Sequence, residues 1–239
     1  MNSQSQIFLI KNNKGGVGKS FLTSQIGHAL TLCDQKVLIL TSDSQNNIFD
    51  FFKGLEIPTY KEGLKSWITK GEGDIIKLRE NLFFIPVEDV VFGNNLTGKF
   101  NVFIEKMRKE YDYILIDSVP TLKVDELFLS IADKFIIPTY CDKIATRMLL
   151  NFIDEIDINK LHSIVINKYI ATQTQLHWKN FLEEQLQGKI DLFVINQFSD
   201  VEKMIEKGKT IFETRTEKTN LIQTQKELIR IVESIINKK

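Results

Sequence analysis

Cysteine and histidine are scarce in this sequence, which contains only Cys33 and Cys141 and three scattered histidines. Neither residue type recurs at the short spacings that zinc or iron–sulfur ligands require. Two widely separated cysteines outside any redox motif are typical of a chain that works in a reducing compartment, so a cytoplasmic location is expected. The composition therefore argues against a zinc site and against an iron–sulfur carrier.

Long apolar runs and an excess of one charge are also missing. No run reaches the roughly 18 residues of a transmembrane helix, and the first residues, MNSQSQIFLIKNN, lack the basic start and the cleavage site of a secretory signal. The 31 Lys and Arg residues balance 31 Asp and Glu residues, which excludes a uniformly basic nucleic-acid coat protein and an acidic tail. With 43% hydrophobic residues, the chain can bury a globular core.

Short apolar runs alternate with segments of helical periodicity. Ile7–Ile10 and Val37–Leu40 are continuously apolar, as are strands covered on both faces. Similar runs occur at residues 82–87, 113–116, 134–137, 163–166 and 192–195, with helical patterns at residues 20–32, 100–109, 144–156, 174–186 and 221–236. This alternation predicts an α/β fold with a mostly parallel twisted sheet and helices on both faces. The four prolines lie in expected loops or just past apolar runs. Residues 1–239 are expected to form a single domain.

A glycine-rich stretch, KGGVGKS, follows the first predicted strand and opens a predicted helix, which is the position of a phosphate-binding loop. Its glycines allow backbone N–H groups to surround phosphate oxygens. Lys19 would reach the β- and γ-phosphates, and the Ser20 hydroxyl would ligate Mg²⁺. A dinucleotide-binding loop fits less well, because Phe21 occupies the position of its third glycine. The expected nucleotide contacts are Lys14, Gly15, Gly16, Val17, Gly18, Lys19, Ser20 and Phe21.

This loop resembles the deviant Walker A motif K-G-G-x-G-K-[ST] of the ParA/MinD superfamily of dimerising ATPases, since Asn13 replaces the usual first glycine and Lys14 follows it. The resemblance implies a P-loop NTPase fold of deviant Walker A type, with ATP and Mg²⁺ as cofactors. It also implies an ATP-dependent homodimer in which Lys14 reaches the partner's nucleotide. A second cation at the γ-phosphate would stabilise charge that develops during phosphoryl transfer.

A carboxylate follows each of two further apolar runs. The segment TSDSQNN resembles the family's D-x-D-P-Q-x-N motif, in which Asp43 matches while Thr41 and Ser44 depart. By that resemblance Asp43 aligns the attacking water and joins the metal shell; as an alternative, it caps the next turn. Residues 111–120, YDYILIDSVP, resemble the Walker B segment, so Asp117 is expected to hold Mg²⁺ through a water.

The resemblance continues towards the end of the chain. Asn167 follows an apolar run and resembles the residue that contacts adenine in many relatives, since an amide can pair with the edge of that base. A turn-forming asparagine is the alternative. Residues 208–213, GKTIFE, resemble the family's G-x-x-[IV] stretch. No helix-turn-helix segment precedes the first strand, so the chain is most similar to the short ParA type.

Basic residues are in excess near the end of the chain, where residues 202–239 contain nine Lys or Arg and six Glu. ParA relatives bind DNA non-specifically as ATP dimers through this region, and a phosphate-contacting face is expected here. Its candidate residues are Lys203, Lys207, Lys209, Arg215, Lys218, Lys226 and Arg230. A solvated mixed-charge surface is the alternative. Asn196 and Gln197, where many ParA proteins have proline and a basic residue, count against DNA binding.

The last predicted helix repeats apolar residues at a spacing of seven. MinD binds membranes through a carboxy-terminal amphipathic helix, but a membrane helix should have a strongly basic polar face, and here Lys and Glu are mixed. A helix packed on the domain is therefore preferred, and a membrane partner is not expected.

Together with these residues, the resemblance implies a ParA-like ATPase that dimerises on ATP, binds DNA non-specifically and drives plasmid or chromosome segregation. Its hydrolysis would be slow and stimulated by a ParB-like centromere-binding protein, and it would be nucleoid-associated. A MinD-like membrane-positioning ATPase and a small-molecule synthetase of the same fold are the alternatives.

Overall fold

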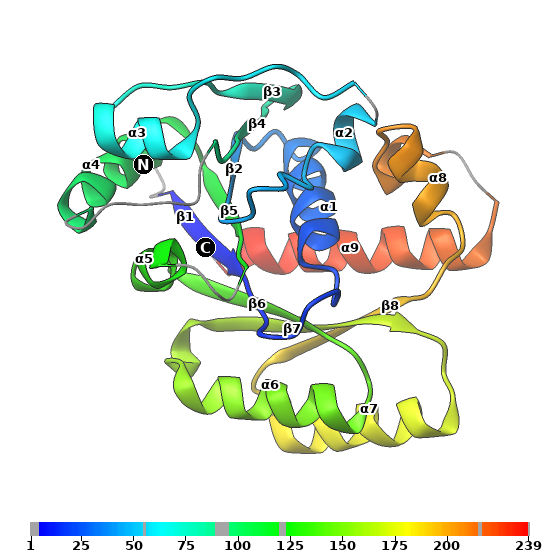
Figure 1. The fold of residues 1–239 in the computed structure, drawn as a ribbon. Helices are drawn as coiled ribbons and strands as arrows, with labels where there is room; N and C mark the ends of the chain where they lie inside the picture. The colour runs from blue at the N-terminus through cyan, green and yellow to red at the C-terminus, as the bar shows by residue number, and fades with distance from the viewer. Residues whose placement is uncertain (1–4, 55, 89–95, 120–122, 215–216, 239) are drawn as a thin grey trace.

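The computed structural model describes residues 5–54, 56–88, 96–119, 123–214 and 217–238, and they form an eight-stranded sheet covered by helices on both faces (Figure 1). The strand order is β3-β4-β2-β5-β1-β6-β7-β8. All neighbouring strands pair in parallel except β3 and β4, which are antiparallel. The predicted α/β fold with a mostly parallel sheet is confirmed.

The elements follow one another largely as strand and helix in turn. The strands are β1 (Gln6–Ile10), β2 (Val37–Thr41), β3 (Ile76–Arg79), β4 (Leu82–Ile85), β5 (Tyr113–Asp117), β6 (Lys134–Thr139), β7 (Leu161–Tyr169) and β8 (Asp191–Asn196). The helices are α1 (Lys19–Thr31), α2 (Asp50–Lys53), α3 (Leu64–Lys70), α4 (Thr97–Glu110), α5 (Lys123–Ile131), α6 (Lys143–Glu155), α7 (Gln173–Leu186), α8 (Val201–Glu206) and α9 (Thr219–Asn237). Short 3₁₀ turns cover Ile158–Lys160 and Ile211–Glu213.

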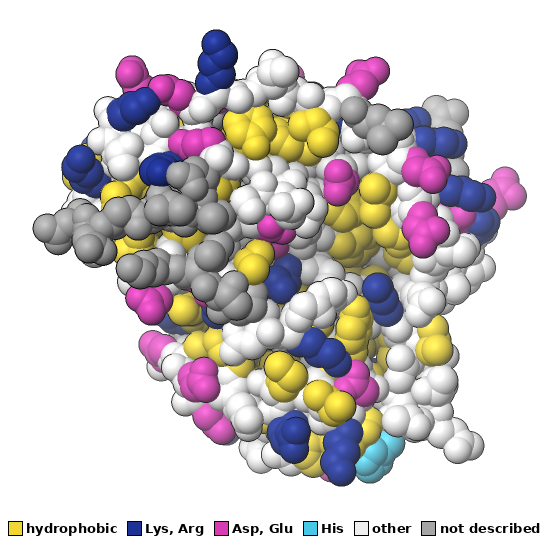
Figure 2. All heavy atoms as spheres, viewed as in Figure 1, with side chains coloured by type: hydrophobic (Ala, Val, Ile, Leu, Met, Phe, Trp, Pro, Cys, Tyr) yellow, Lys and Arg dark blue, Asp and Glu magenta, His cyan; other side chains and the backbone are white. Residues whose placement is uncertain are grey.

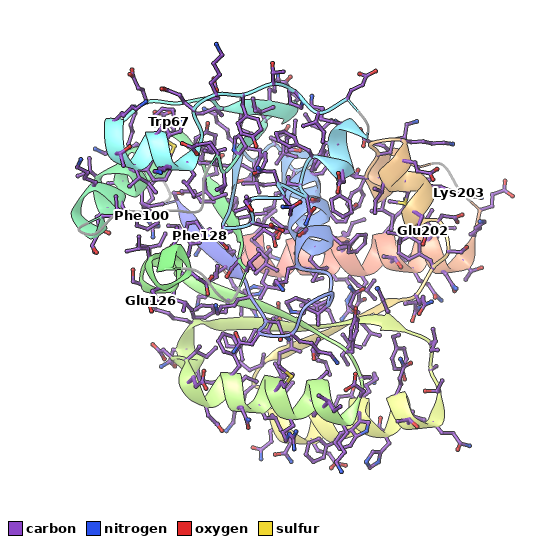
Figure 3. All side chains as sticks on the ribbon, in the orientation of Figure 1. Trp67, Phe100, Glu126, Phe128, Glu202 and Lys203 are labelled. Carbon is purple, nitrogen blue, oxygen red and sulfur yellow. The ribbon has the colours of Figure 1, made fainter. Side chains whose placement is uncertain are left out.

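The sheet separates two hydrophobic clusters. Helices α3 to α7 pack on one face, where the rings of Phe100 and Phe128 lie 5.8 Å apart between α4 and α5 (Figure 3). Helices α1, α2, α8 and α9 pack on the other face. Side chains of a strand point alternately to the two faces, so in β1 Ile7 and Leu9 join the first cluster and Phe8 and Ile10 the second. Burial on both faces explains why the central strands are continuously apolar.

Two details of the sheet differ from the sequence prediction. The antiparallel strand β3, with the sequence IKLR, was not predicted, because it is short and alternates apolar with charged residues. Strand β6 extends beyond the apolar run 134–137 and includes Pro138, which pairs with Val165 of β7. Its carbonyl oxygen accepts a hydrogen bond of 2.7 Å from Asn12 Nδ2, so this strand also supports the phosphate loop.

Helix α9 lies across the sheet beside α1 and β8 (Figure 1). Its apolar stripe, which includes Leu221, Leu228 and Ile235, is fully buried in the second cluster. Among the described residues, no helix combines the length and the hydropathy needed to cross a bilayer. The predicted packing of the last helix on the rest of the protein is therefore confirmed.

The order of the central strands brings the predicted site residues to one edge. Strand β5 lies between β1 and β2, and its last residue, Asp117, is in register with Ile10 and with Thr41. Because parallel strands end at the same edge, the segments that follow β1, β2 and β5 meet there, as ligand sites of open α/β sheets do.

Candidate nucleotide-binding site

The KGGVGKS loop between β1 and α1 has its carbonyl groups directed at side chains of its own chain. Lys19 Nζ donates to the Lys14 carbonyl at 3.3 Å, Tyr140 Oη donates to the Gly16 carbonyl, and Asn167 Nδ2 donates to the Val17 carbonyl at 2.9 Å. Gly16 and Gly18 have φ angles of +73° and +96°, which favour glycine. With the carbonyls bonded in this way and a helix N-terminus beside them, the loop's N–H groups are suited to an anion.

Lys14 and Lys19, the two lysines of the loop, have different surroundings. Lys19 is partly buried, and desolvation lowers its pKa against the raising effect of Asp117. Lys14 Nζ lies 3.1 Å from Asp142 Oδ2 and 5.2 Å from the centre of the Tyr140 ring. In this single chain the ammonium group of Lys14 is therefore held by its own α6, and its predicted role at a partner's nucleotide stays a prediction.

Ser20 and Asp117 meet as a pair at the start of α1 and the end of β5. Ser20 Oγ donates to Asp117 Oδ2 at 2.6 Å. Asp117 is only 2% exposed, and within the part of the chain that the structure describes its other oxygen, Oδ1, has no hydrogen-bond partner. Burial raises the pKa of Asp117 to about 6, although the Ser20 hydrogen bond opposes the shift. A buried carboxylate oxygen without a donor is costly unless a cation or its water approaches.

This pair fits a magnesium ion. Mg²⁺ is commonly held by one or two carboxylates together with phosphate oxygens and waters. Ser20 and Asp117 would hold it, and the ion would polarise the phosphate and neutralise its charge. Within the described ranges, no cluster of three or more His, Cys, Asp or Glu forms a closed metal cage.

Asp43 lies beside this pair, in the turn after β2. Its Oδ1 accepts a hydrogen bond of 2.9 Å from the Gln45 N–H, and its Oδ2 accepts one of 2.9 Å from Asn47 Nδ2. Asp43 therefore stabilises its own turn, as the alternative interpretation expects. It also lines a cavity that begins at the phosphate loop. Thr41, which replaces the family's aspartate, is fully buried and bridges two elements: its hydroxyl donates to the Asp117 carbonyl and accepts from the Asp43 N–H.

Asn167 is 6% exposed and its amide group is engaged within the chain. Nδ2 donates to the phosphate loop, and Oδ1 accepts from the Lys168 N–H at 2.9 Å. Its side chain lies so close to Gly18 that a Cβ there would meet Nδ2 at 2.1 Å. The structure thus gives Asn167 a loop-supporting role, while its predicted contact with adenine stays a prediction.

A cavity of about 850 Å³ extends from the phosphate loop to a hollow between α2 and α8. Figure 2 shows this hollow with hydrophobic side chains inside it. Asn47, which matches the last position of the D-x-D-P-Q-x-N motif, lines the cavity. It is also lined by residues that sequence reasoning did not select: Asp50, Phe51, Phe198, Val201, Glu202 and Ile205. Asn196 and Gln197, considered above only for DNA, also line it. No local motif marks the unselected residues, because α2 and α8 meet only in the folded chain.

The predicted basic face is a mixture of charges. Lys218 pairs with Asp200, and Arg230 pairs with Glu227. Lys203 lies beside Glu202 on α8 (Figure 3). The exposed lysines of this region include Lys203, Lys207, Lys209 and Lys226. Pro120 of the Walker B segment and Arg215 of the basic face lie outside the described residues.

A protein-family model described as an AAA domain, AAA_31, matches residues 5–172, which include the phosphate loop, Asp43 and Asp117. The chain belongs to this family. Together with similarity to ParA, Soj and MinD proteins, the match confirms the resemblance to P-loop ATPases of the ParA/MinD type.

The relatives of this chain include both a protein named MinD and a protein named Soj. A protein provisionally named septum site-determining protein MinD from Emiliania huxleyi is 35% identical over 121 residues, which are 48% of this chain and 44% of that protein. An uncharacterized protein from Methanocaldococcus jannaschii is 26% identical over 86% of this chain and 90% of its own length. Sporulation initiation inhibitor protein Soj from Bacillus subtilis is 26% identical over 66% of this chain and 67% of Soj. The match thus spans less than half of the Emiliania protein.

Solved structures share the fold over nearly the whole chain. MinD from Aquifex aeolicus has a TM-score of 0.76 at 17% identity and covers 98% of both chains. A provisionally named plasmid partition protein from Borrelia burgdorferi bound to AMPPNP has a TM-score of 0.73 at 24% identity, over 99% of this chain and 100% of its own. MinD from Pyrococcus horikoshii complexed with Mg-ADP has a TM-score of 0.73 at 17% identity, over 97% of this chain and 96% of its own. At these identities the likeness establishes the fold.

Proposed function

We propose that this protein is a Mg²⁺-dependent ATPase of the ParA type, which dimerises on ATP, binds DNA non-specifically and segregates a plasmid or chromosome. The observation that carries the proposal is that the phosphate loop brings Ser20 to Asp117, whose buried Oδ1 has no hydrogen-bond partner among the described residues. AMPPNP and Mg-ADP in two solved structures of this fold support ATP and Mg²⁺ as the ligands.

Each predicted side chain has a role in the proposed ATP hydrolysis. Backbone N–H groups of Gly15 to Ser20 bind phosphates, and Lys19 reaches the β- and γ-phosphates. Ser20 and Asp117 hold Mg²⁺, which neutralises the phosphate charge when bound. Asp43 aligns the attacking water and contacts the metal shell.

The edge of the sheet that carries the loop is suited to a second copy of the chain. Exposed apolar side chains gather at the neighbouring ends of β7, α6 and α7, where Ile144, Ile170 and Leu176 are 59%, 57% and 49% exposed. Lys14 lies at the same edge, where it pairs with Asp142, the N-cap residue of α6. In a dimer, Lys14 would leave Asp142 and reach the partner's nucleotide. ATP binding would then favour the dimer, and a ParB-like protein that stimulates hydrolysis would dissolve it.

A MinD-like positioning ATPase is the second candidate, favoured by the similarity to MinD proteins in sequence and in fold. It requires an apolar surface for lipid, and the apolar stripe of α9 is buried against α1 and β8. Partition on DNA, by a nucleoid-associated protein, is therefore preferred.

Phosphate release from ATP, measured with and without Mg²⁺, tests the proposal. The wild-type protein should hydrolyse ATP slowly and only with Mg²⁺, and Lys19→Ala should abolish turnover. Lys14→Ala should still bind ATP, but it should neither dimerise nor hydrolyse ATP. Analytical ultracentrifugation measures the dimerisation. Normal hydrolysis by Lys14→Ala would contradict the action of this lysine across a dimer. Turnover that requires a carboxylate metabolite would instead favour the small-molecule synthetase.

A further inference from the structure

A buried ion pair lies behind the phosphate loop, outside the residues assigned above. Lys11 Nζ pairs with Asp125 Oδ2, and Ser118 Oγ donates to the other carboxylate oxygen of Asp125. Lys11, Asp125 and Ser118 are 4%, 5% and 0% exposed. Taking two charges out of water is expensive, and apolar residues of similar volume are often at least as stabilising. Stability alone therefore does not account for charged residues at this place.

The three residues join three elements at the edge that carries the site. Lys11 directly follows β1, and its N–H donates to the Ile136 carbonyl of β6 at 3.2 Å. Asp125 lies in the first turn of α5, the helix that carries the labelled Glu126 and Phe128 in Figure 3. Ser118 directly follows Asp117, the last residue of β5. The cluster thus ties the end of β5 to the end of β1 and to α5.

The contacts of this cluster help to fix the orientation of the Asp117 carboxylate. On one side, the Asp117 carbonyl accepts hydrogen bonds from Thr41 Oγ1 at 3.1 Å and from the Ser42 N–H at 3.2 Å. On the other side, the backbone is held by Ser118, whose hydroxyl is bonded to Asp125. Misplacement of a site residue by about 1 Å can cost two orders of magnitude in rate. A strand end fixed on both sides keeps the carboxylate in place for a metal.

We propose that Lys11 and Asp125 are positioning residues, which act through Ser118 to hold Asp117 in the orientation that couples Mg²⁺ to nucleotide binding. This inference rests on the proposed function. Charge also reaches the loop from the pair, since Lys11 lowers and Asp125 raises the pKa of Lys19, both by less than desolvation lowers it. Because these two effects have opposite signs, the pair adds no net charge beside Lys19.

Affinity for a fluorescent, non-hydrolysable ATP analogue, measured with and without Mg²⁺, tests the inference. Ser118→Ala keeps the ion pair and breaks its link to the strand that carries Asp117. Lys11→Met/Asp125→Leu replaces the pair by apolar residues, which should leave the melting temperature within a few degrees of the wild-type value. Wild-type protein should bind at least about tenfold more tightly with Mg²⁺, and both variants should retain a Mg²⁺ effect of about twofold or less.

Arg108→Met/Asp133→Asn is the matched control, because this pair ties β1 to a helix at the opposite edge of the sheet. There Arg108 bonds Asp133, and Asp133 Oδ2 accepts from the Ile7 N–H at 2.8 Å. The control should lower the melting temperature and preserve the full Mg²⁺ effect. If the Lys11/Asp125 double variant does not fold, Ser118→Ala decides the question alone.

Two outcomes are distinguishable. Wild-type binding with Mg²⁺, together with an unchanged Mg²⁺ effect in Ser118→Ala, would overturn this inference and leave the proposed function standing. A wild-type protein that binds no analogue under either condition would contradict the proposed function, and this inference with it.

Discussion

Asp43 shows at the residue scale how one side chain can serve both a turn and a reaction. Its Oδ1 accepts from the Gln45 N–H, and Oδ2 accepts from Asn47 Nδ2. Asp43→Asn keeps an oxygen for the turn and removes the negative charge. If Asp43 aligns the attacking water, this variant should bind ATP normally and hydrolyse it about 10²- to 10⁴-fold more slowly. The test is single-turnover hydrolysis beside a melting curve; near-normal turnover would leave Asp43 only its turn-stabilising role.

His162 gives a second residue-scale prediction, on stability against pH. It is 5% exposed, its ring meets the Phe8 ring edge-on at 5.3 Å, and burial lowers its pKa to about 4 from an ordinary value near 6.5. Between pH 6.5 and 4 the unfolded chain therefore binds a proton that the folded chain does not. The free energy of unfolding should fall as the pH falls through this window, by up to about 3 kcal/mol from this group.

His162→Phe removes the titrating group and keeps a ring against Phe8. Urea denaturation of the variant at pH 7 and pH 4.5 should show a smaller loss of stability on acidification than the wild-type protein, by about 2 kcal/mol. His28, whose pKa is also lowered by burial, is present in both proteins and cancels in the comparison. An equal loss in both proteins would exclude His162 as a source of acid sensitivity.

Helix α9 carries the main prediction at the scale of elements. Leu228 is fully buried in the cluster formed with α1, whereas the adjacent Ile229 is 45% exposed. Leu228→Ala should lower the free energy of unfolding by about 2–5 kcal/mol, and Ile229→Ala should lower it by less than about 1 kcal/mol. Neither variant should change co-sedimentation with anionic lipid vesicles. Vesicle binding that disappears in Leu228→Ala without a loss of stability would instead support a MinD-like membrane helix.

Elements were predictable from the sequence where one face or both faces of the element are buried. Strand β5, YILID, is buried at every position and was evident as a continuous apolar run that delivers Asp117. Strand β3 was missed because it is short and forms the edge of the sheet. The contact of Lys14 with Asp142 joins residues 128 positions apart, and the α2–α8 hollow depends on tertiary packing. Neither leaves a local pattern.

For the molecule as a whole, the proposed function is an ATP-controlled switch between a monomer and a DNA-binding dimer. The sheet brings the loop, Asp43 and Asp117 to one edge. The exposed Lys203 and Lys207 lie on and directly after α8, and other residues of this helix line the cavity beside the loop. Two copies joined at this edge would present both sets of lysines together. If this dimer binds DNA, each lysine alone would contribute little, but the doubled set would release enough counterions to make the affinity depend steeply on salt.

Binding of the Asp43→Ala protein to random-sequence duplex DNA, measured with ATP and with ADP between about 50 and 200 mM salt, decides whether ATP controls DNA binding. The Asp43→Ala protein should bind DNA tightly with ATP but not with ADP, and its affinity for DNA should fall steeply as the salt concentration rises. Adding Lys203→Ala/Lys207→Ala to this protein should make its affinity for DNA depend less steeply on salt. The control pair Lys99→Ala/Lys109→Ala, on α4 at the opposite face of the sheet, should leave this salt dependence unchanged. DNA binding that is absent with both nucleotides, or equally strong with both, would contradict the proposal that ATP controls DNA binding.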